Sequence, residues 1–187
     1  MEPTDQYLFT SERLGFRSWN ENDLEKFATM NADSEVMRYF PKPLSREESA
    51  EFLDRLFKHF KRHGYCYFAT ELLETGEFLG FIGLAWQNYD APFPPATDIG
   101  WRLKKAAWGK AYATEGANRC LKFAFEELGL EEVISTCPAK NKRSERVMQK
   151  IGMNCMGEFQ HPGLQDHPEL QPCVWYKISK NQWLRDQ

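Results

Sequence analysis

The chain has 187 residues, with 24 Lys plus Arg against 27 Asp plus Glu, and therefore a formal net charge of −3. A protein that binds nucleic acid mainly through phosphate contacts usually has a basic excess, so no nucleic-acid partner is expected. Hydrophobic residues make up 42% of the chain and charged residues 27%, which is typical of a globular protein. The length favours one domain over residues 1–187.

The five cysteines contain no Cys-x-x-Cys pair and are odd in number, so neither a disulfide framework nor a zinc site is expected. The first residues, Met1–Gln6, are acidic and polar, whereas a secretory signal is basic and then apolar. The longest apolar run, Phe78–Trp86, is interrupted by glycines and is much shorter than the about 20 residues of a membrane span. These features predict a reduced, cytoplasmic protein with no membrane partner.

The first half of the chain carries signals for both strands and helices. Polar and apolar residues alternate near the start, Asn20 fits a helix N-cap, and Ser45-Arg46-Glu47-Glu48 forms a capping box. The predicted elements are a strand at Arg13–Arg17, helices at Asn20–Asn31 and Ser45–Gly64, a hairpin of strands at Tyr65–Glu71 and Phe78–Trp86, and a strand at Thr97–Leu103.

In the second half, an apolar stripe from Ala113 to Leu128 predicts a long helix that ends at Gly129. Two proline-rich segments, Gln87–Ala96 and His161–Pro172, predict loops because proline cannot donate to a strand ladder. The other predicted elements are a strand at Val133–Cys137, a helix from Asn141 to Gly152, and strands at Cys155–Phe159 and Cys173–Ile178. This order indicates a mixed α/β (α+β) domain.

The segment between the strand at Thr97–Leu103 and the long helix lacks a capping residue. None of the residues from Lys105 to Ala111 is Ser, Thr, Asp or Asn, so the first N–H groups of the helix have no side-chain acceptor. An anion is favoured there because free amides and the positive end of the helix dipole both attract phosphate. Lys104, Lys105 and Lys110 add positive charge. The alternative is a solvent-capped helix end beside ordinary surface lysines.

The hexapeptide Trp108-Gly109-Lys110-Ala111-Tyr112-Ala113 resembles the pyrophosphate loop of the GNAT N-acetyltransferases and is most similar to the RimJ/RimL branch. Trp108 replaces a polar residue, as is common in this branch, and Ala111 replaces a glycine, so that its methyl group crowds a bound phosphate. The resemblance extends from about residue 8 to 184 through Asp98-Ile99-Gly100-Trp101-Arg102-Leu103, Asn141-Lys142-Arg143-Ser144, Lys150-Ile151-Gly152-Met153, Phe159-Gln160-His161-Pro162 and Trp175-Tyr176-Lys177-Ile178.

This resemblance implies a GNAT fold: a central mixed, mostly antiparallel sheet of about seven strands, splayed between the fourth and fifth, with about four flanking helices. It also implies acetyl-CoA as cosubstrate, bound without a metal ion. The residues that it assigns to acetyl-CoA are Leu103 and Lys105 along the strand, Trp108, Gly109, Lys110, Ala111, Tyr112, Ala113 and Thr114 around the diphosphate, and Asn141 and Ser144 beside the pantetheine arm.

For the chemistry, the resemblance implies direct attack of a neutral amine on the thioester, with Asp98 as general base. An ordinary aspartate, with a pKa of about 3.9, is a weak base at neutral pH, so the pKa has to rise or a water chain has to relay the proton. The alternative is that Asp98 is a strand-end residue in contact with solvent. Ser144 is the candidate for bonding the departing thiolate, because Met148 stands where many members carry a tyrosine acid. Asn141 and Ser144 also fit an N-cap and a first helical turn.

Trp86 and His161 are the candidate contacts to the acceptor; the alternatives are that Trp86 belongs to the core, where tryptophan most often lies, and that His161 orders its loop. The resemblance implies an N-acetyltransferase acting on a primary amine, either a protein N-terminus or a small molecule. The alternative is a catalytically silent CoA-binding or interaction domain of the same fold. Exposed β edges and aromatic loops are compatible with a homodimer.

Overall fold

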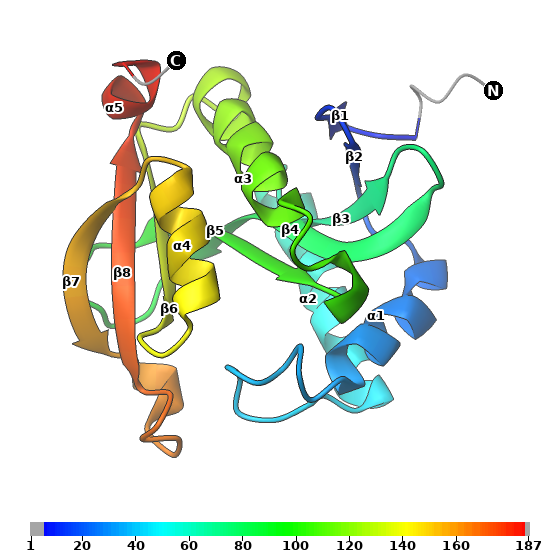
Figure 1. Cartoon of the computed structure of the whole chain (residues 1–187), viewed down its shortest axis with the longest axis horizontal. Coiled ribbons are helices and arrows are strands. Elements are labelled where there is room, and N and C mark those ends of the chain that lie inside the picture. The colour runs from blue at the N-terminus through cyan, green and yellow to red at the C-terminus, as the bar shows by residue number, and fades with distance from the viewer. Residues whose placement is uncertain (1–5, 186–187) are drawn as a thin grey trace.

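The computed structural model describes residues 6–185, which form one eight-stranded sheet with helices on both faces (Figure 1). The strand order is β1-β2-β3-β4-β5-β6-β8-β7. The strands are β1 (Phe9–Thr10), β2 (Leu14–Arg17), β3 (Tyr67–Leu72), β4 (Glu77–Gln87), β5 (Ala96–Leu103), β6 (Glu132–Pro138), β7 (Asn154–Gln160) and β8 (Pro172–Ser179). The helices are α1 (Leu24–Ala32), α2 (Arg46–His63), α3 (Tyr112–Lys122), α4 (Lys142–Lys150) and α5 (Lys180–Arg185), with short 3-10 or π segments η2 (Glu21–Asp23), η3 (Lys105–Ala107), η4 (Phe123–Glu127) and η5 (Pro162–Leu164).

The predicted strands are confirmed as β2 to β8, and the predicted helices are confirmed as α1 to α4. Two elements were not predicted. β1 has two residues and pairs antiparallel with β2, and α5 has six residues. Both are too short for a hydrophobic period to be recognised, because one period of a helix already takes about 3.6 residues.

The predicted helix caps are confirmed in two places. Ser45 forms a capping box with Glu48 at the start of α2, and Gly64 ends that helix in the left-handed conformation, with φ of 77°. Asn20 also forms a capping box, but it opens the 3-10 turn η2, and α1 follows directly. The long helix departs from the prediction because its last turns, in η4, are π-helical.

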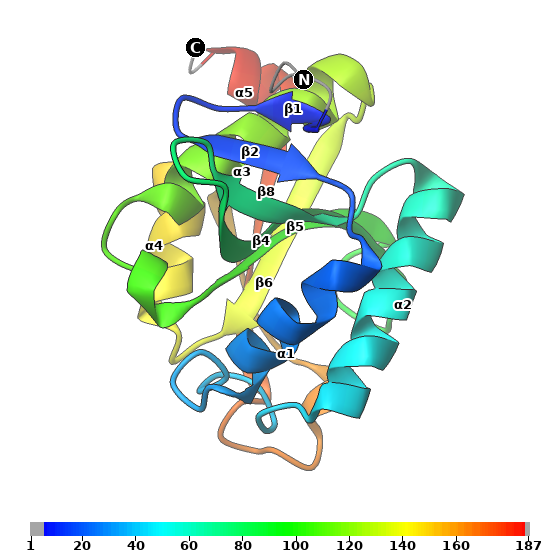
Figure 2. The same ribbon diagram turned by 90° about the vertical axis from the view of Figure 1, so that its right-hand side faces the viewer.

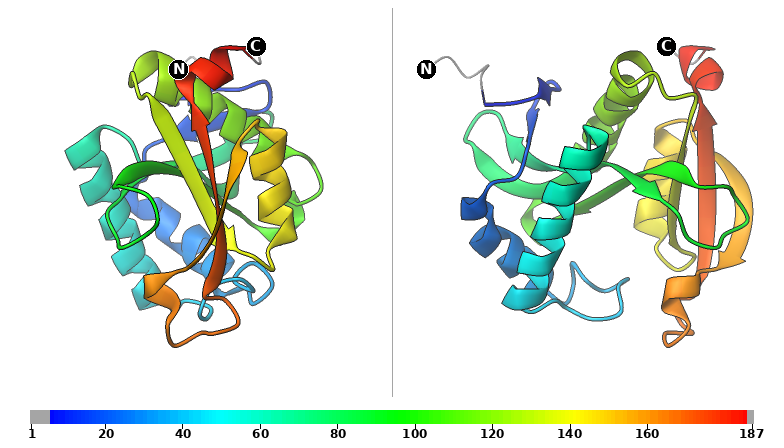
Figure 3. Two further views of the ribbon diagram at one scale, coloured as in Figure 1. Left: turned by 90° about the vertical axis from the view of Figure 1, so that its left-hand side faces the viewer. Right: turned by 180° about the vertical axis from the view of Figure 1, so that it is seen from behind.

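The sheet divides into two parts between β5 and β6, as predicted. All other neighbouring strands are antiparallel, whereas β5 and β6 are parallel and pair through Asp98 and Ile134. Ser135 Oγ donates a hydrogen bond of 2.8 Å to the carbonyl of Ile99, one residue further along. Beyond this point the strands diverge (Figure 1). Figure 3 shows the same separation from behind, with β6, β8 and β7 standing apart.

The two faces of the sheet carry different helices. Phe81 on β4 contacts Phe27 of α1 and Phe52 of α2 through ring centroids 6.3 and 6.0 Å apart. The next residue, Ile82, points to the opposite face, where its side chain packs against Gly116 of α3. Figure 2 shows α1 and α2 side by side on their face, and the left view of Figure 3 shows α4 beside β6 and β8. Side chains alternate between the two faces along β5. The β5 residues that share a face with Phe81 therefore lie on the face that α1 and α2 cover.

Residues 6–185 contain neither a membrane-spanning helix nor a cluster of metal-ligating side chains. No helix in this range is both long and apolar enough to span a bilayer. Nor does this range contain three or more His, Cys, Asp or Glu side chains grouped so that they could ligate a metal ion.

Candidate active site

The connection from β5 to α3 presents a row of backbone amides. Gly109 and Ala111 are both left-handed, with φ of 76° and 62°. No side chain caps α3, which confirms the predicted uncapped helix start. Within residues 6–185, the N–H groups from Gly109 to Thr114 donate to no backbone carbonyl and to no side chain. Successive amides in such conformations point toward one place and suit an anion.

The lysines near this row are not equally available to an anion. Lys104 Nζ lies 2.5 Å from Glu77 Oε1, and Lys105 Nζ lies 2.7 Å from Glu35 Oε2, so carboxylates balance both charges. Lys110 is exposed and forms no ion pair within the part of the chain that the structure describes. Lys110 is therefore the lysine best placed to accompany a diphosphate at the amide row.

The edge of β5 that faces the splay remains open. The N–H of Lys104 bonds to the carbonyl of Leu79, and Gly80 lies opposite Leu103. Because hydrogen-bonded and non-hydrogen-bonded pairs alternate in an antiparallel ladder, the N–H and C=O of Leu103 point away from β4, toward the splay. The Leu103 carbonyl accepts a bond of 2.8 Å from the Trp108 indole, which leaves the Leu103 N–H for a ligand.

Trp108 and Lys105 were both expected to bind acetyl-CoA, but their backbone groups are not arranged as that expectation requires. The Trp108 N–H donates to the Lys105 carbonyl at 3.1 Å, so the row of free amides begins at Gly109. Lys105 lies in η3 and not in β5. The guanidinium of Arg143 lies 5.2 Å from the Trp108 ring centroid. Trp108 thus holds the end of β5 against the start of α4.

The start of α4 brings Asn141 and Ser144 together. Asn141 Oδ1 accepts a bond of 3.2 Å from the Ser144 N–H, which confirms the predicted N-cap. Burial raises the pKa of the Cys137 thiol to about 12, opposed by a hydrogen bond with the Ser144 side chain. Met148 is fully buried in the core. Its side chain has no proton to donate, so the tyrosine acid of other members has no counterpart at this position.

Asp98 lies on the α1–α2 face, at the point where β5 and β6 meet. It is 7% exposed, so the alternative of a solvent-exposed strand-end residue is wrong. Burial raises its pKa to about 7, opposed by hydrogen bonds from the Tyr67 hydroxyl and from the backbone of Thr136. The Tyr67 Oη–Asp98 Oδ2 distance is 2.5 Å, and Gln87 Nε2 donates to the same hydroxyl at 3.3 Å. A carboxylate with this pKa can exchange protons at neutral pH.

The His161 ring contacts the ring of Tyr89, which lies near Asp98. The two ring centroids are 4.7 Å apart, and the Asp98 charge contributes, after burial, to raising the pKa of Tyr89 to about 12. Burial lowers the pKa of His161, and its Nδ1 accepts a bond of 3.1 Å from the Gly163 N–H. His161 therefore orders its own loop and also lies next to a neighbour of Asp98.

Trp86 does not reach Asp98. Its neighbour Ala85 is the residue that pairs with Asp98, so alternation along β4 directs the Trp86 side chain to the opposite face. The side chain is not in the core either, because Trp86 is 42% exposed. Its backbone N–H donates to Nε2 of His59 on α2 at 3.2 Å.

Three residues of the site were not singled out from the sequence. Tyr67 bonds to Asp98, although the two lie far apart in the sequence. Glu115 accepts bonds from the Ser11 hydroxyl at 2.7 Å and from Arg13 at 2.8 and 2.7 Å, which ties the first turn of α3 to the start of β2. Arg102 shares a face of β5 with Asp98. The alternation along β5 is the one signal in the sequence that could have identified Arg102.

A splayed sheet, an open strand edge and a row of free amides are the features expected of an acyltransferase that receives its acyl group from a coenzyme A thioester. Comparison with known proteins identifies the family. The family described as acetyltransferase (GNAT) domain matches residues 13–154, and the chain belongs to this family. It is accordingly an acetyl-CoA-dependent N-acetyltransferase.

Individual relatives agree with this assignment. The uncharacterized N-acetyltransferase YnaD of Bacillus subtilis is 32% identical over 152 residues, which are 80% of this chain and 84% of YnaD. The FsC-acetyl coenzyme A-N(2)-transacetylase of Aspergillus fumigatus is 34% identical over 122 residues, which are 60% of this chain and 50% of that protein. The crystal structure of a GNAT-family acetyltransferase from Bacillus anthracis superposes with a TM-score of 0.76 at 28% identity, covering 92% of this chain and 98% of that one.

Proposed function

We propose that the acceptor of this enzyme is a primary amine, carried by a small molecule or by a protein N-terminus, and that the amine attacks the thioester of acetyl-CoA directly. We also infer that residues 1–187 act as one domain. The observation that carries the proposal is a pair of features that flank the open edge of β5. One is the amide row from Gly109 to Thr114, and the other is the buried Asp98 carboxylate.

The described residues fit acetyl-CoA, which supplies the activated acetyl group. The amides from Gly109 to Thr114 hold the diphosphate, with Lys110 beside them. The Leu103 N–H bonds the pantetheine arm along the open strand edge. Asn141 and Ser144, at the start of α4, lie beside the arm, and the Ser144 hydroxyl bonds the sulfur that leaves. Positioning by fixed backbone groups favours the reaction because these groups need no reorganisation when charge develops.

Asp98 accepts the proton that the amine loses. Its pKa of about 7 places it near the working pH, where a general base is most effective. The Tyr67 hydroxyl bonds Asp98 Oδ2 at 2.5 Å and the backbone of Thr136 also bonds the carboxylate, so these two groups fix it and the amine or a water molecule uses a remaining lone pair. Removal of a general base typically costs about 10²- to 10⁴-fold in rate.

The cysteines support direct attack and not a covalent acetyl-enzyme. Burial raises the pKa of Cys66 to about 12 and that of Cys173 to about 11, and it raises the pKa of Cys120 and Cys137 as well. A thiol attacks a thioester as the thiolate, and these shifts disfavour the thiolate. Cys155 is exposed on β7, at the sheet edge away from β5.

Binding of acetyl-CoA is tested by thermal denaturation. At 100 times the dissociation constant, a ligand that binds only the folded state stabilises it by about 2.7 kcal/mol. For a chain of this length, 1 kcal/mol corresponds to about 2–4 °C, so the melting temperature rises by about 5–10 °C. Absence of any shift at saturating acetyl-CoA contradicts the proposed binding site.

The base is tested by the pH dependence of kcat/KM, measured as release of the CoA thiol. In the wild type kcat/KM rises as the pH passes about 7, because Asp98 must lose its proton before it can accept one. In Asp98→Asn this rise is lost and kcat/KM falls by about 100-fold or more. Asp90→Asn, which removes an exposed carboxylate, is the matched control and leaves the profile unchanged. If Asp98→Asn and Ser144→Ala both retain full turnover, the assigned roles are wrong.

A further inference from the structure

Arg102 is a buried cation with no carboxylate partner in the described part of the chain. It lies on β5, is 8% exposed, and donates from Nη1 to Asn31 Oδ1 at 2.7 Å. Its Nε is buried, and no acceptor lies within hydrogen-bonding distance of it among residues 6–185. Leaving a buried charged donor unsatisfied is costly, and an acceptor atom from a bound ligand or water would remove that cost.

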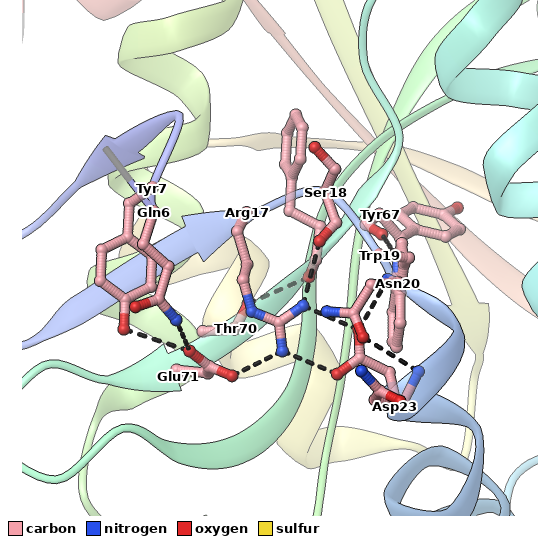
Figure 4. Close-up of polar contacts among 12 residues, drawn as sticks. Gln6, Tyr7, Arg17, Ser18, Trp19, Asn20, Asp23, Tyr67, Thr70 and Glu71 are labelled. Carbon is pink, nitrogen blue, oxygen red and sulfur yellow. Dashed lines mark hydrogen bonds and ion pairs between the residues drawn. The ribbon is translucent and has the colours of Figure 1, made fainter. Parts of the chain in front are cut away.

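The other buried arginine of the sheet shows the usual arrangement. Arg17 on β2 donates to both carboxylate oxygens of Asp23 at 2.7 Å and to Glu71 at 2.5 Å (Figure 4). The side chains of Gln6 and Tyr7 complete the bonding of Glu71. The protein therefore neutralises Arg17 fully, with two carboxylates, and leaves Arg102 with a neutral amide.

Aromatic rings cover the Arg102 guanidinium. The ring centroids of Phe40, Phe81 and Phe52 lie 4.0, 5.3 and 5.5 Å from its central carbon. These rings favour a cation without satisfying its N–H groups. Burial lowers the pKa of Arg102 to about 10, so the guanidinium keeps its charge at neutral pH. Phe40, whose ring centroid is the nearest of the three, lies in the segment between α1 and α2 and is 37% exposed, so one side of the aromatic cover reaches the protein surface.

Arg102 and Asp98 lie on the same face of β5 but do not pair with each other. They are four positions apart in the sequence, or about 13 Å along an extended strand. Gly100 lies between them, and a Cβ at that position would stand 3.0 to 3.3 Å from the ring and hydroxyl of Tyr67. Tyr67 bonds to Asp98 and stacks on Phe81 at 5.1 Å, and the Phe81 ring centroid lies 5.3 Å from the central guanidinium carbon of Arg102. Two buried groups of opposite charge are thus held apart on either side of one tyrosine.

We propose that Arg102 binds a carboxylate carried by the acceptor amine, while the amino group of the same molecule faces Asp98. This inference rests on the proposed function and specifies its substrate class: amino carboxylates in preference to neutral amines. A guanidinium fork matches the geometry of a carboxylate, and Nε together with an adjacent Nη can make two parallel bonds. Displacement of the Phe40 ring admits the carboxylate to this fork.

The test uses matched acceptors that differ in one group. They are glycine, β-alanine, 4-aminobutyrate and 6-aminohexanoate, each compared with its primary amide. Release of the CoA thiol gives kcat/KM, and titration of each acceptor into the CoA complex gives its dissociation constant. At least one acid exceeds its amide by about 10-fold to 100-fold in both measurements, as expected for a hydrogen bond between charged groups. The favoured chain length reports the distance from the amine to the carboxylate.

Arg102→Gln removes the preference for the acid, and Arg102→Lys restores part of it because the charge returns without the fork. Arg55→Gln is the matched control. Arg55 is exposed on α2, and its guanidinium lies 5.3 Å from the Phe52 ring centroid, so the preference for the acid persists in this variant. Unchanged acetyl-CoA affinity and melting temperature in Arg102→Lys exclude loss of the fold as the cause.

The outcomes separate the two proposals. Equal turnover of acids and amides by the wild type overturns the carboxylate inference and supports N-acetylation. A preference for the acid that survives in Arg102→Gln leads to the same two conclusions. Binding of an acid that depends on Arg102 but gives no thiol release supports the carboxylate site and contradicts catalysis on these amines. Absence of both binding and turnover across the panel overturns the carboxylate inference.

Discussion

Replacement of Ala111 by glycine tests the structure of the amide row. Ala111 is the one non-glycine residue with positive φ in the described part of the chain, at 62°. A left-handed conformation costs an L-residue about 1–2 kcal/mol. Glycine avoids this cost but loses about 0.5–1 kcal/mol more in chain entropy on folding. The net gain of about 0.5–1 kcal/mol raises the melting temperature by about 1–4 °C.

The same substitution affects ligand binding. Ala111 lies within the row that is proposed to hold the diphosphate, and removal of its methyl group brings the ligand closer to the backbone. We expect acetyl-CoA to bind about two- to five-fold more tightly, equivalent to about 0.5–1 kcal/mol. Isothermal titration calorimetry measures this change, and differential scanning calorimetry measures the change in stability.

Ala113→Gly is the control, because Ala113 lies in the first turn of α3 with helical geometry. There glycine costs about 0.5–1 kcal/mol, so the melting temperature falls. Opposite signs for the two alanines support the strained conformation at Ala111. A lower melting temperature in Ala111→Gly, or equal shifts in both variants, refutes the reasoning.

Three further predictions concern stability, each measured by urea denaturation. Arg17→Met leaves Asp23 and Glu71 buried without their cation, and we expect a loss of about 3–5 kcal/mol; a loss below 1 kcal/mol contradicts the assigned pairing. Gly83→Ala places a methyl group 2.2 Å from the Cys66 carbonyl oxygen, so a soluble variant of wild-type stability is incompatible with the β3–β4 register. Met148→Tyr introduces a larger, polar side chain at a fully buried position and costs about 1–3 kcal/mol, and wild-type stability of this variant contradicts the placement of Met148 in the core.

The sequence was sufficient for features that depend on local chemistry. The N-caps at Asn20 and Asn141, the capping box at Ser45 and the missing cap before Tyr112 each depend on a few consecutive residues, and the structure confirms them. The strand positions followed from short apolar runs between turn residues. The family motifs then supplied the order of the strands and the place of the splay.

Features that depend on tertiary contacts could not be predicted in the same way. The environment of Asp98 depends on Tyr67 of β3 and on Thr136 of β6. The pairing of β3 with β4 places Tyr67 next to Asp98. The isolation of Arg102 becomes visible only when the neighbours of β5 are known. Trp86 was a candidate contact to the acceptor, with the core as the alternative because tryptophan is usually buried, but the register of β4 with β5 turns its side chain away from Asp98 and leaves it 42% exposed.

The narrow junction between β5 and β6 has a mechanical consequence. Within the described residues, the backbone pairing of the two halves of the sheet rests on Asp98 and Ile134, so this junction is the natural pivot for any opening of the molecule. A residue at a pivot moves least when the arms rotate. The proposed proton acceptor would therefore keep its position in any rotation of one half of the sheet against the other about this junction.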